Sequence, residues 1–143
     1  MRGKNINEIN VGDEQRFSKT ISETDIYSFA GIVGDFNPMH INESYAQETR
    51  FKHRIAHGLI SLGLISTVLG NFLPGEGTIY LNQTVSFLRP VFIGDTITAL
   101  VKVISKDEIK NRIKLSTICI NQNDEMIISG EAEVMPPKTK QAP

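Results

Sequence analysis

The segment from residue 57 to 70, HGLISLGLISTVLG, restricts the fold of this chain more than any other. With about 3.6 residues per turn, its apolar side chains fall on more than one side of a helix. They are Leu59, Leu62, Ile65 and Leu69 on one side and Ile60, Leu64 and Val68 on another. The segment is shorter than the roughly 20 residues that a membrane helix needs. We therefore expect a helix that is enclosed by its own protein.

After residue 77 the pattern changes to a period of two, which is typical of strands with one buried face. The breaks at RPVFIGD, SKDEIKN and NQND favour an antiparallel meander. The alternating sets are Ile79, Leu81, Val85 and Phe87; Ile97, Ala99, Val101 and Val103; Ile113, Leu115, Thr117 and Cys119; and Met126, Ile128, Gly130, Ala132 and Val134. Curling this sheet around the apolar helix is the simplest way to bury both. The prediction is an α+β chain with a single hot-dog fold.

Shorter elements are predicted before residue 52. A strand is expected over 11–19, and the spacing of Ser22 and Asp25 matches a capping box at the start of a helix over 23–32. A second short helix is expected after Asn42, whose side chain is suited to cap it.

The whole chain, 1–143, is expected to form one domain, because it has no internal repeat and no shift in composition. Its proline-rich end, about 136–143, is predicted to be a flexible tail. The single cysteine, Cys119, excludes an intrachain disulfide and a multi-cysteine metal site. It lies in the apolar run LSTICI, where we expect a small buried side chain rather than a nucleophile.

The charge balance and the N-terminus exclude several classes of partner. The net charge is −1, with 15 basic and 16 acidic residues, so no overall field attracts nucleic acid or an acidic membrane. The N-terminal residues lack the apolar region of a secretory signal. We therefore expect a cytoplasmic protein without membrane insertion.

The heptapeptide GDFNPMH, residues 34–40, concentrates groups that can carry out acid–base chemistry. On an unbroken helix, Asp35 and His40 would lie roughly 140° apart and could not share a substrate. Pro38 disfavours helical geometry at Asn37, so the backbone is expected to bend between the two side chains. Such a bend can bring one carboxylate and one imidazole to the same water molecule.

These motifs resemble those of a known enzyme family. The stretch FAGIVGDFNPMHINESYA, with its D-x-N-P-x-H core, resembles the hydratase 2 signature of the MaoC-like, R-specific enoyl-CoA hydratases. AHGLISLGLISTVLG is similar to the central hot-dog helix of that family, and GTIYLNQTVSFLRPVFIGDTI to its following strands. The likeness covers nearly the whole chain and is closest to the short bacterial hydratases that feed polyhydroxyalkanoate synthesis.

The resemblance implies a reaction and a set of site residues. The reaction is the reversible syn addition of water to trans-2-enoyl-CoA, which gives (R)-3-hydroxyacyl-CoA. By resemblance, the catalytic pair is Asp35 and His40, and the backbone N–H of Gly58 is the donor to the thioester oxygen. Asn37 and Ser66 would support the site, and Leu69 would line the acyl pocket. The family resemblance also implies a homodimer with an acyl-CoA substrate, no metal and no separate cofactor, since coenzyme A is part of the substrate.

Several alternatives remain open at this point. One is a 3-hydroxyacyl dehydratase or hydratase whose acyl group is carried on acyl carrier protein. The others are a hot-dog thioesterase and a module that binds acyl thioesters without catalysis. His57 is expected to orient the start of the helix, and His53 to face solvent. Lys52, Arg54 and Arg89 are candidates either for phosphate contacts or for solvated surface charges. The sequence leaves open the chain length, the direction of the reaction and the group that delivers a proton to C2.

Overall fold

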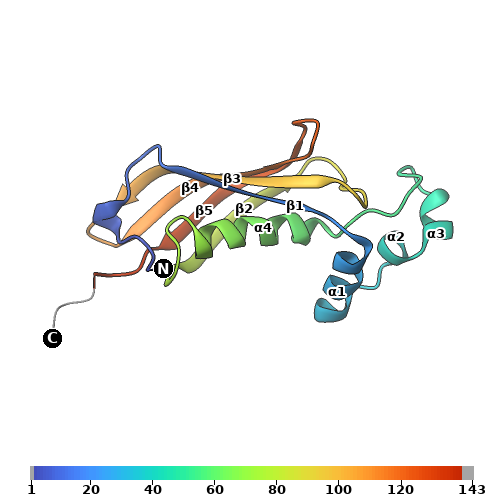
Figure 1. Ribbon diagram of the computed structural model, residues 1–143, viewed down its shortest axis with the longest axis horizontal. Coiled ribbons are helices and arrows are strands. Elements are labelled where there is room, and N and C mark those ends of the chain that lie inside the picture. Colours follow the sequence, from blue (N-terminus) through green and yellow to red (C-terminus); the bar gives the residue numbers. More distant parts are fainter. Residues whose placement is uncertain (1, 140–143) are drawn as a thin grey trace.

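A five-stranded antiparallel sheet curves over a central helix in the computed structural model, which describes residues 2–139 (Figure 1). The strands are β1 (Glu14–Thr20), β2 (Ile79–Phe87), β3 (Thr96–Asp107), β4 (Arg112–Ile120) and β5 (Met126–Met135). The helix is α4 (Gly58–Asn71), close to the predicted range of 57–70. The predicted α+β class and the hot-dog architecture are thus confirmed.

The strand order is β1-β3-β4-β5-β2, which differs from the predicted meander at one strand. Consecutive strands β3, β4 and β5 do pair as a meander, but β2 pairs with β5 instead of with its neighbour in the sequence, β3. The connection over 88–95 passes the start of α4, where Ala56 donates a backbone hydrogen bond to Val91 and Ile55 bridges Phe92. These contacts hold the connection near the helix. The chain then enters β3, which pairs with β1 and β4 and not with β2.

The core lies between α4 and the concave face of the sheet. Leu64, Ile65, Val68 and Leu69 of the helix are buried there, together with the inward set of β3. The expectation that the helix is enclosed on all sides is wrong for the single chain, because Leu59 is exposed. One side of α4 is covered by this sheet and the opposite side is not.

The two edges of the sheet differ in character. β1 exposes mainly polar side chains, in the sequence EQRFSKT, which discourages pairing with another strand. The alternating set predicted to be buried on β2 is instead exposed at Ile79, Leu81 and Phe87. Because β2 is an outer strand, these apolar side chains have no covering layer within the described chain.

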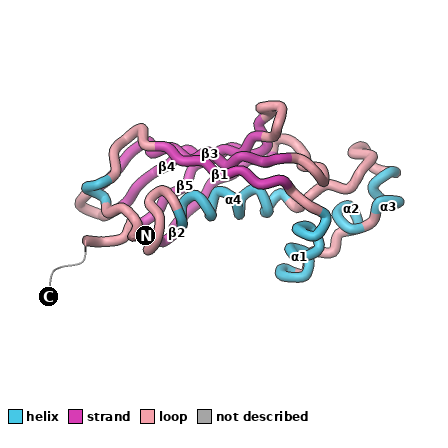
Figure 2. Tube along the Cα trace, in the orientation of Figure 1, coloured by secondary structure: helices cyan, strands magenta, loops and turns pink. Residues whose placement is uncertain are grey.

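Helices α1 (Glu23–Val33), α2 (Pro38–Ile41) and α3 (Glu43–Gln47) lie together beyond the end of the sheet where α4 begins (Figure 2). The predicted capping box at Ser22 is present, with Asp25 as its second member, and Asn42 caps α3 as expected. The sequence did not predict α2. Pro38 begins this helix, since proline at the first helical position loses no intrahelical hydrogen bond.

The segment after β5 contacts the rest of the chain at Pro136. Pro136 is buried, and its carbonyl accepts a hydrogen bond from the Asn111 side chain at 2.9 Å. The flexible tail predicted over about 136–143 stays a prediction, and its residues 140–143 lie outside the described range. Between residues 2 and 139, none of the helices has the length and apolar character that crossing a membrane requires.

Candidate active site

The bend between α1 and α2 is built by local hydrogen bonds. Helix α1 ends at Gly34, which adopts the left-handed conformation with φ of 79°. The Asp35 carboxylate then accepts a hydrogen bond from the backbone N–H of Asn37 at 3.2 Å. The Asn37 side chain in turn caps α2 by accepting from the N–H of Met39 at 3.1 Å. The predicted break at Asn37-Pro38 is confirmed, and Asn37 shapes the bend.

His40 is buried in the last turn of α2, and its orientation is fixed by one backbone group. Its Nδ1 lies 2.6 Å from the carbonyl oxygen of Ile55. Because a carbonyl can only accept, Nδ1 carries the proton in this hydrogen bond. The neutral ring therefore presents its lone pair at Nε2, which is the nitrogen available to a bound water.

His57 contacts both members of the predicted catalytic pair. Its ring stacks on that of His40, with 3.8 Å between centroids, and its Nε2 donates to the backbone carbonyl of Asp35 at 2.9 Å. Its Nδ1 is buried and has no hydrogen-bond partner within residues 2–139. The sequence predicted that His57 orients the start of α4, but its side chain makes no capping hydrogen bond to that helix. Its contacts are with Asp35 and His40.

The Asp35 carboxylate lies at the open side of this cluster, and its side chain is 49% exposed. One carboxylate oxygen of Asp35 and one ring nitrogen each from His40 and His57 lie within 4.8 Å of one another. A water that forms two hydrogen bonds of about 2.8 Å spans up to about 5 Å. A single water molecule could therefore reach both Asp35 and His40, and their shared use of one water stays a prediction.

A cavity of about 290 Å³ adjoins His40 and the first residue of α4, Gly58. The N–H groups in the first turn of a helix have no intrahelical partner, and the helix dipole makes this end positive. The cavity walls also include Ser61 of α4, Phe87 of β2 and Ile128 of β5. His40 and the start of α4 thus border an apolar recess, whereas Asp35 lies close to His40 without lining it.

Phe87 closes directly over Gly58. A Cβ atom added at residue 58 would lie 2.7 Å from Cδ1 and from Cε1 of the Phe87 ring. From the sequence, Gly58 was expected only to donate its backbone N–H to the thioester oxygen. The structure adds a packing reason for glycine, because the aromatic ring already fills the space of a side chain.

Four predicted site residues do not line this cavity. Asp35 and Asn37 lie at the bend between α1 and α2, and the other two lie further along α4. Ser66 is exposed on α4, two turns beyond Gly58, and Leu69 is 1% exposed within the core. Neither side chain lines the cavity around His40 in the single chain. Their supporting and acyl-pocket roles stay predictions.

The basic residues near the site separate into different environments. Of the three phosphate candidates, Arg89 lines the cavity, and its Nη1 lies 3.3 Å from the carboxylate of Glu125. Lys52 is exposed, whereas the Arg54 side chain is only 12% exposed and bonded to the protein. Arg50 also lines the cavity, and sequence reasoning missed it because its surroundings contain no motif.

His53 and Cys119 lie in the environments that the sequence predicted for them. His53 faces solvent, and its Nδ1 lies 3.0 Å from the Glu43 carboxylate. Cys119 is fully buried, and burial raises the pKa of its thiol to about 12, so it is not a nucleophile at neutral pH.

The three groups at Asp35, His40 and His57 are also the types that bind metal ions. However, the stacked His40 and His57 rings are inclined by only 30°. Imidazole binds a metal through a lone pair in the ring plane, and two nearly parallel rings direct these lone pairs side by side rather than to one point. The geometry does not favour a shared metal ion, and the metal-free site stays a prediction.

Comparison with known proteins identifies close relatives. Residues 6–123 match the family model described as "MaoC like domain". An (R)-specific enoyl-CoA hydratase of Rhodospirillum rubrum is 51% identical over 130 residues, covering 91% of this chain and 90% of that protein. A 3-hydroxybutyryl-CoA dehydratase of Methylorubrum extorquens is 43% identical, covering 94% and 85% of the two chains. The unliganded structure of R-hydratase PhaJ1 from Pseudomonas aeruginosa superimposes with a TM-score of 0.90 at 39% identity, covering 99% and 94%.

Proposed function

The chain belongs to the family of MaoC-like domains, and from this premise we propose that it is an (R)-specific enoyl-CoA hydratase. It adds water reversibly to a trans-2-enoyl-CoA and forms the (R)-3-hydroxyacyl-CoA. The observation that carries the proposal is the approach of the Asp35 carboxylate and a His40 ring nitrogen to within 4.8 Å, beside the start of α4.

The first step is the activation of water by the Asp35–His40 pair. The water donates one hydrogen to the Asp35 carboxylate and the other to Nε2 of His40, so its lone pair is directed at C3 of the substrate. Asp35 acts as the general base and takes one proton as the bond to C3 forms. The pair then returns one proton to C2 on the same face, which gives syn addition and leaves the enzyme unchanged.

The second requirement is a donor for the charge that develops on the thioester oxygen. Attack at C3 moves an electron pair onto this oxygen and forms an enolate. The N–H of Gly58, at the positive end of α4, is the group proposed to stabilise it. Loss of one such donor typically raises a barrier by about 2.7–4 kcal/mol.

This division of labour requires neither a metal ion nor an organic cofactor, because base and electrophilic donor both come from the chain. We expect activity to survive dialysis against a chelator, with kcat and KM unchanged. A loss of activity that returns on addition of one divalent cation would contradict this part of the proposal.

The test of the reaction is the loss of enoyl-thioester absorbance when the purified protein is mixed with crotonyl-CoA. Chiral analysis of the product should give only the R enantiomer. Unchanged absorbance with release of free thiol would instead indicate a thioesterase, which attacks C1. Parallel assays with the acyl carrier protein thioester, and with acyl chains of increasing length, measure the carrier and chain preferences that the sequence left open.

We also propose that the working enzyme is a homodimer that pairs along β2. The exposed apolar residues Ile79, Leu81 and Phe87 on this outer strand support the proposal, whereas the other edge, β1, is polar. Light scattering should give twice the mass of the chain, and an active monomer would refute this arrangement. A cytoplasmic location remains a prediction of the sequence.

A further inference from the structure

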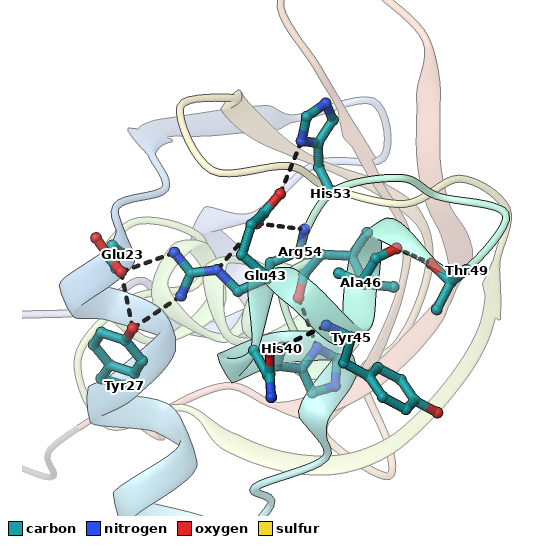
Figure 3. A network of polar contacts seen from close by, with 11 residues as sticks. Glu23, Tyr27, His40, Glu43, Tyr45, Ala46, Thr49, His53 and Arg54 are labelled. Carbon is teal, nitrogen blue, oxygen red and sulfur yellow. Dashed lines mark hydrogen bonds and ion pairs between the residues drawn. The ribbon is translucent and has the colours of Figure 1, made fainter.

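Arg54 joins three separate segments of the chain. Its Nη2 donates to the Glu23 carboxylate at 2.8 Å and its Nη1 to the Tyr27 hydroxyl at 2.9 Å, both on α1. Its Nε and its backbone N–H donate to one carboxylate oxygen of Glu43 on α3, at 3.4 and 3.3 Å (Figure 3). The guanidinium thus fills the space between α1, α3 and the segment that leads to α4.

The acidic partners of Arg54 are themselves held in place. The Tyr27 hydroxyl donates to Glu23 at 2.8 Å, so these two residues and Arg54 form a closed triangle. The hydrogen bond from Arg54 holds the pKa of the Glu23 carboxyl below 4.5, with a smaller effect from Tyr27. Glu43 also bonds His53, which is the largest cause of its lowered pKa. Both carboxylates are therefore charged at neutral pH.

The residues that follow Arg54 carry three parts of the active site. The carbonyl of Ile55 accepts the hydrogen bond from His40, and the N–H of Ile55 donates to the carbonyl of Met39 at 3.3 Å. His57 stacks on His40, and Gly58 begins α4. A shift in the backbone just after Arg54 therefore displaces the acceptor that fixes the proton of His40 at Nδ1.

We propose that Arg54 is a positioning residue: by tying α1 and α3 to its own segment, it holds the Ile55 carbonyl where it fixes the orientation and tautomer of His40. The proposal rests on the proposed function for its kinetic consequence only. A misplacement of about 1 Å at a reacting group can cost about 10²-fold in rate, even when the altered residue is remote. A planar guanidinium suits this role because it donates in several fixed directions at once.

The test compares Arg54→Met with Arg54→Lys, using kinetics and the ¹⁵N chemical shifts of the histidine rings. We expect Arg54→Met to lower kcat by about 10–100-fold with KM little changed, because a misplacement of about 1 Å at a reacting group can cost up to about 10²-fold. The His40 ring should lose its predominance of the Nδ1-protonated tautomer. Arg54→Lys should restore little, because a single ammonium group cannot reach Glu23, Tyr27 and Glu43 together.

The control is Arg112→Met. Arg112 also pairs with a glutamate, Glu133, at 3.9 Å and donates to backbone carbonyls, but it lies on β4 and outside the cavity. It should leave kcat and the His40 shifts unchanged. If Arg54→Met does not fold, Tyr27→Phe removes one arm of the triangle at a half-exposed position and should shift the His40 tautomer in the same direction.

Two results would overturn the proposal. One is wild-type kcat in Arg54→Lys, which would reduce the role of Arg54 to its charge. The other is an unchanged His40 tautomer in Arg54→Met or, failing that variant, in Tyr27→Phe. Absence of hydratase activity in the wild-type protein would refute the proposed function instead, and the ¹⁵N measurement would still decide the role of Arg54.

Discussion

The imidazole of His57 lies flat against that of His40, with 3.8 Å between the ring centroids and 30° between the ring planes. Each ring donates through one nitrogen to a backbone carbonyl, His40 to Ile55 and His57 to Asp35. The stack therefore couples the two sides of the bend. The backbone that carries the Asp35 carboxylate and the ring of His40 are held by the same residue, His57.

His57→Phe tests this coupling. Phenylalanine keeps a flat ring against His40 but cannot donate to the Asp35 carbonyl, so the carboxylate should lose its fixed position. We expect kcat to fall by about 10–100-fold, because a reacting group displaced by about 1 Å can lose up to about 10²-fold in rate. Steady-state kinetics and a thermal melt check this. Wild-type kcat in a folded variant would show that the stack alone is sufficient.

Asp35→Asn removes the proposed general base and keeps its size. We expect kcat to fall by about 10²-fold or more, the usual contribution of a positioned base. Stability should change little, because Asp35 is half exposed and asparagine can still accept from the Asn37 N–H. Asp107→Asn, at the opposite end of β3 from the 88–95 connection, is the matched control and should retain full activity. Equal rates for the two variants would remove Asp35 from the mechanism.

Gly58→Ala tests the contact with Phe87. The new methyl group would lie 2.7 Å from two ring carbons, so either the ring or the start of α4 must shift. We expect kcat/KM to fall by about tenfold or more, a cost of the order that small misplacements produce. The double variant with Phe87→Ala should recover part of the loss, and this coupling is measured by a double-mutant cycle. If the two effects simply add, the ring does not restrict residue 58.

Cys119 should be unreactive in the folded protein. Burial raises the pKa of its thiol from 9.0 to about 12, and only the thiolate reacts with alkylating reagents. Alkylation of the native protein should therefore stay slow from neutral pH up to the region of this raised pKa, whereas in urea it should accelerate near the ordinary value. Mass spectrometry after timed labelling measures both rates. Rapid labelling of folded, active enzyme at neutral pH would contradict this assignment.

Local patterns predicted the parts of the fold that depend on nearby residues. The capping box of Ser22 and Asp25 and the range of α4 are set by side chains within a few positions of each other, and both were found as expected. The residues of β3 and β4 that were predicted to be buried are buried, because the alternation of apolar and polar residues shows directly which face of a strand is apolar.

The failures concern relations between distant segments. Alternation on β2 does not say which strand it pairs with, and its apolar face suggested burial although it lies at an edge. The acceptor for His40 is the backbone carbonyl of Ile55, which no side-chain motif can reveal. Arg54 was considered only as a phosphate ligand or a surface charge, because its partner Glu23 lies 31 positions away.

The difference between the two borders of the sheet sets a limit on how many subunits can join. A second copy that docks antiparallel along β2 is related to the first by a two-fold axis. A single contact therefore covers the apolar β2 edge of both subunits. What then faces outward at either end is β1, with its charged and hydroxyl side chains. Association of this kind closes on itself at two subunits and offers no template for a growing fibre.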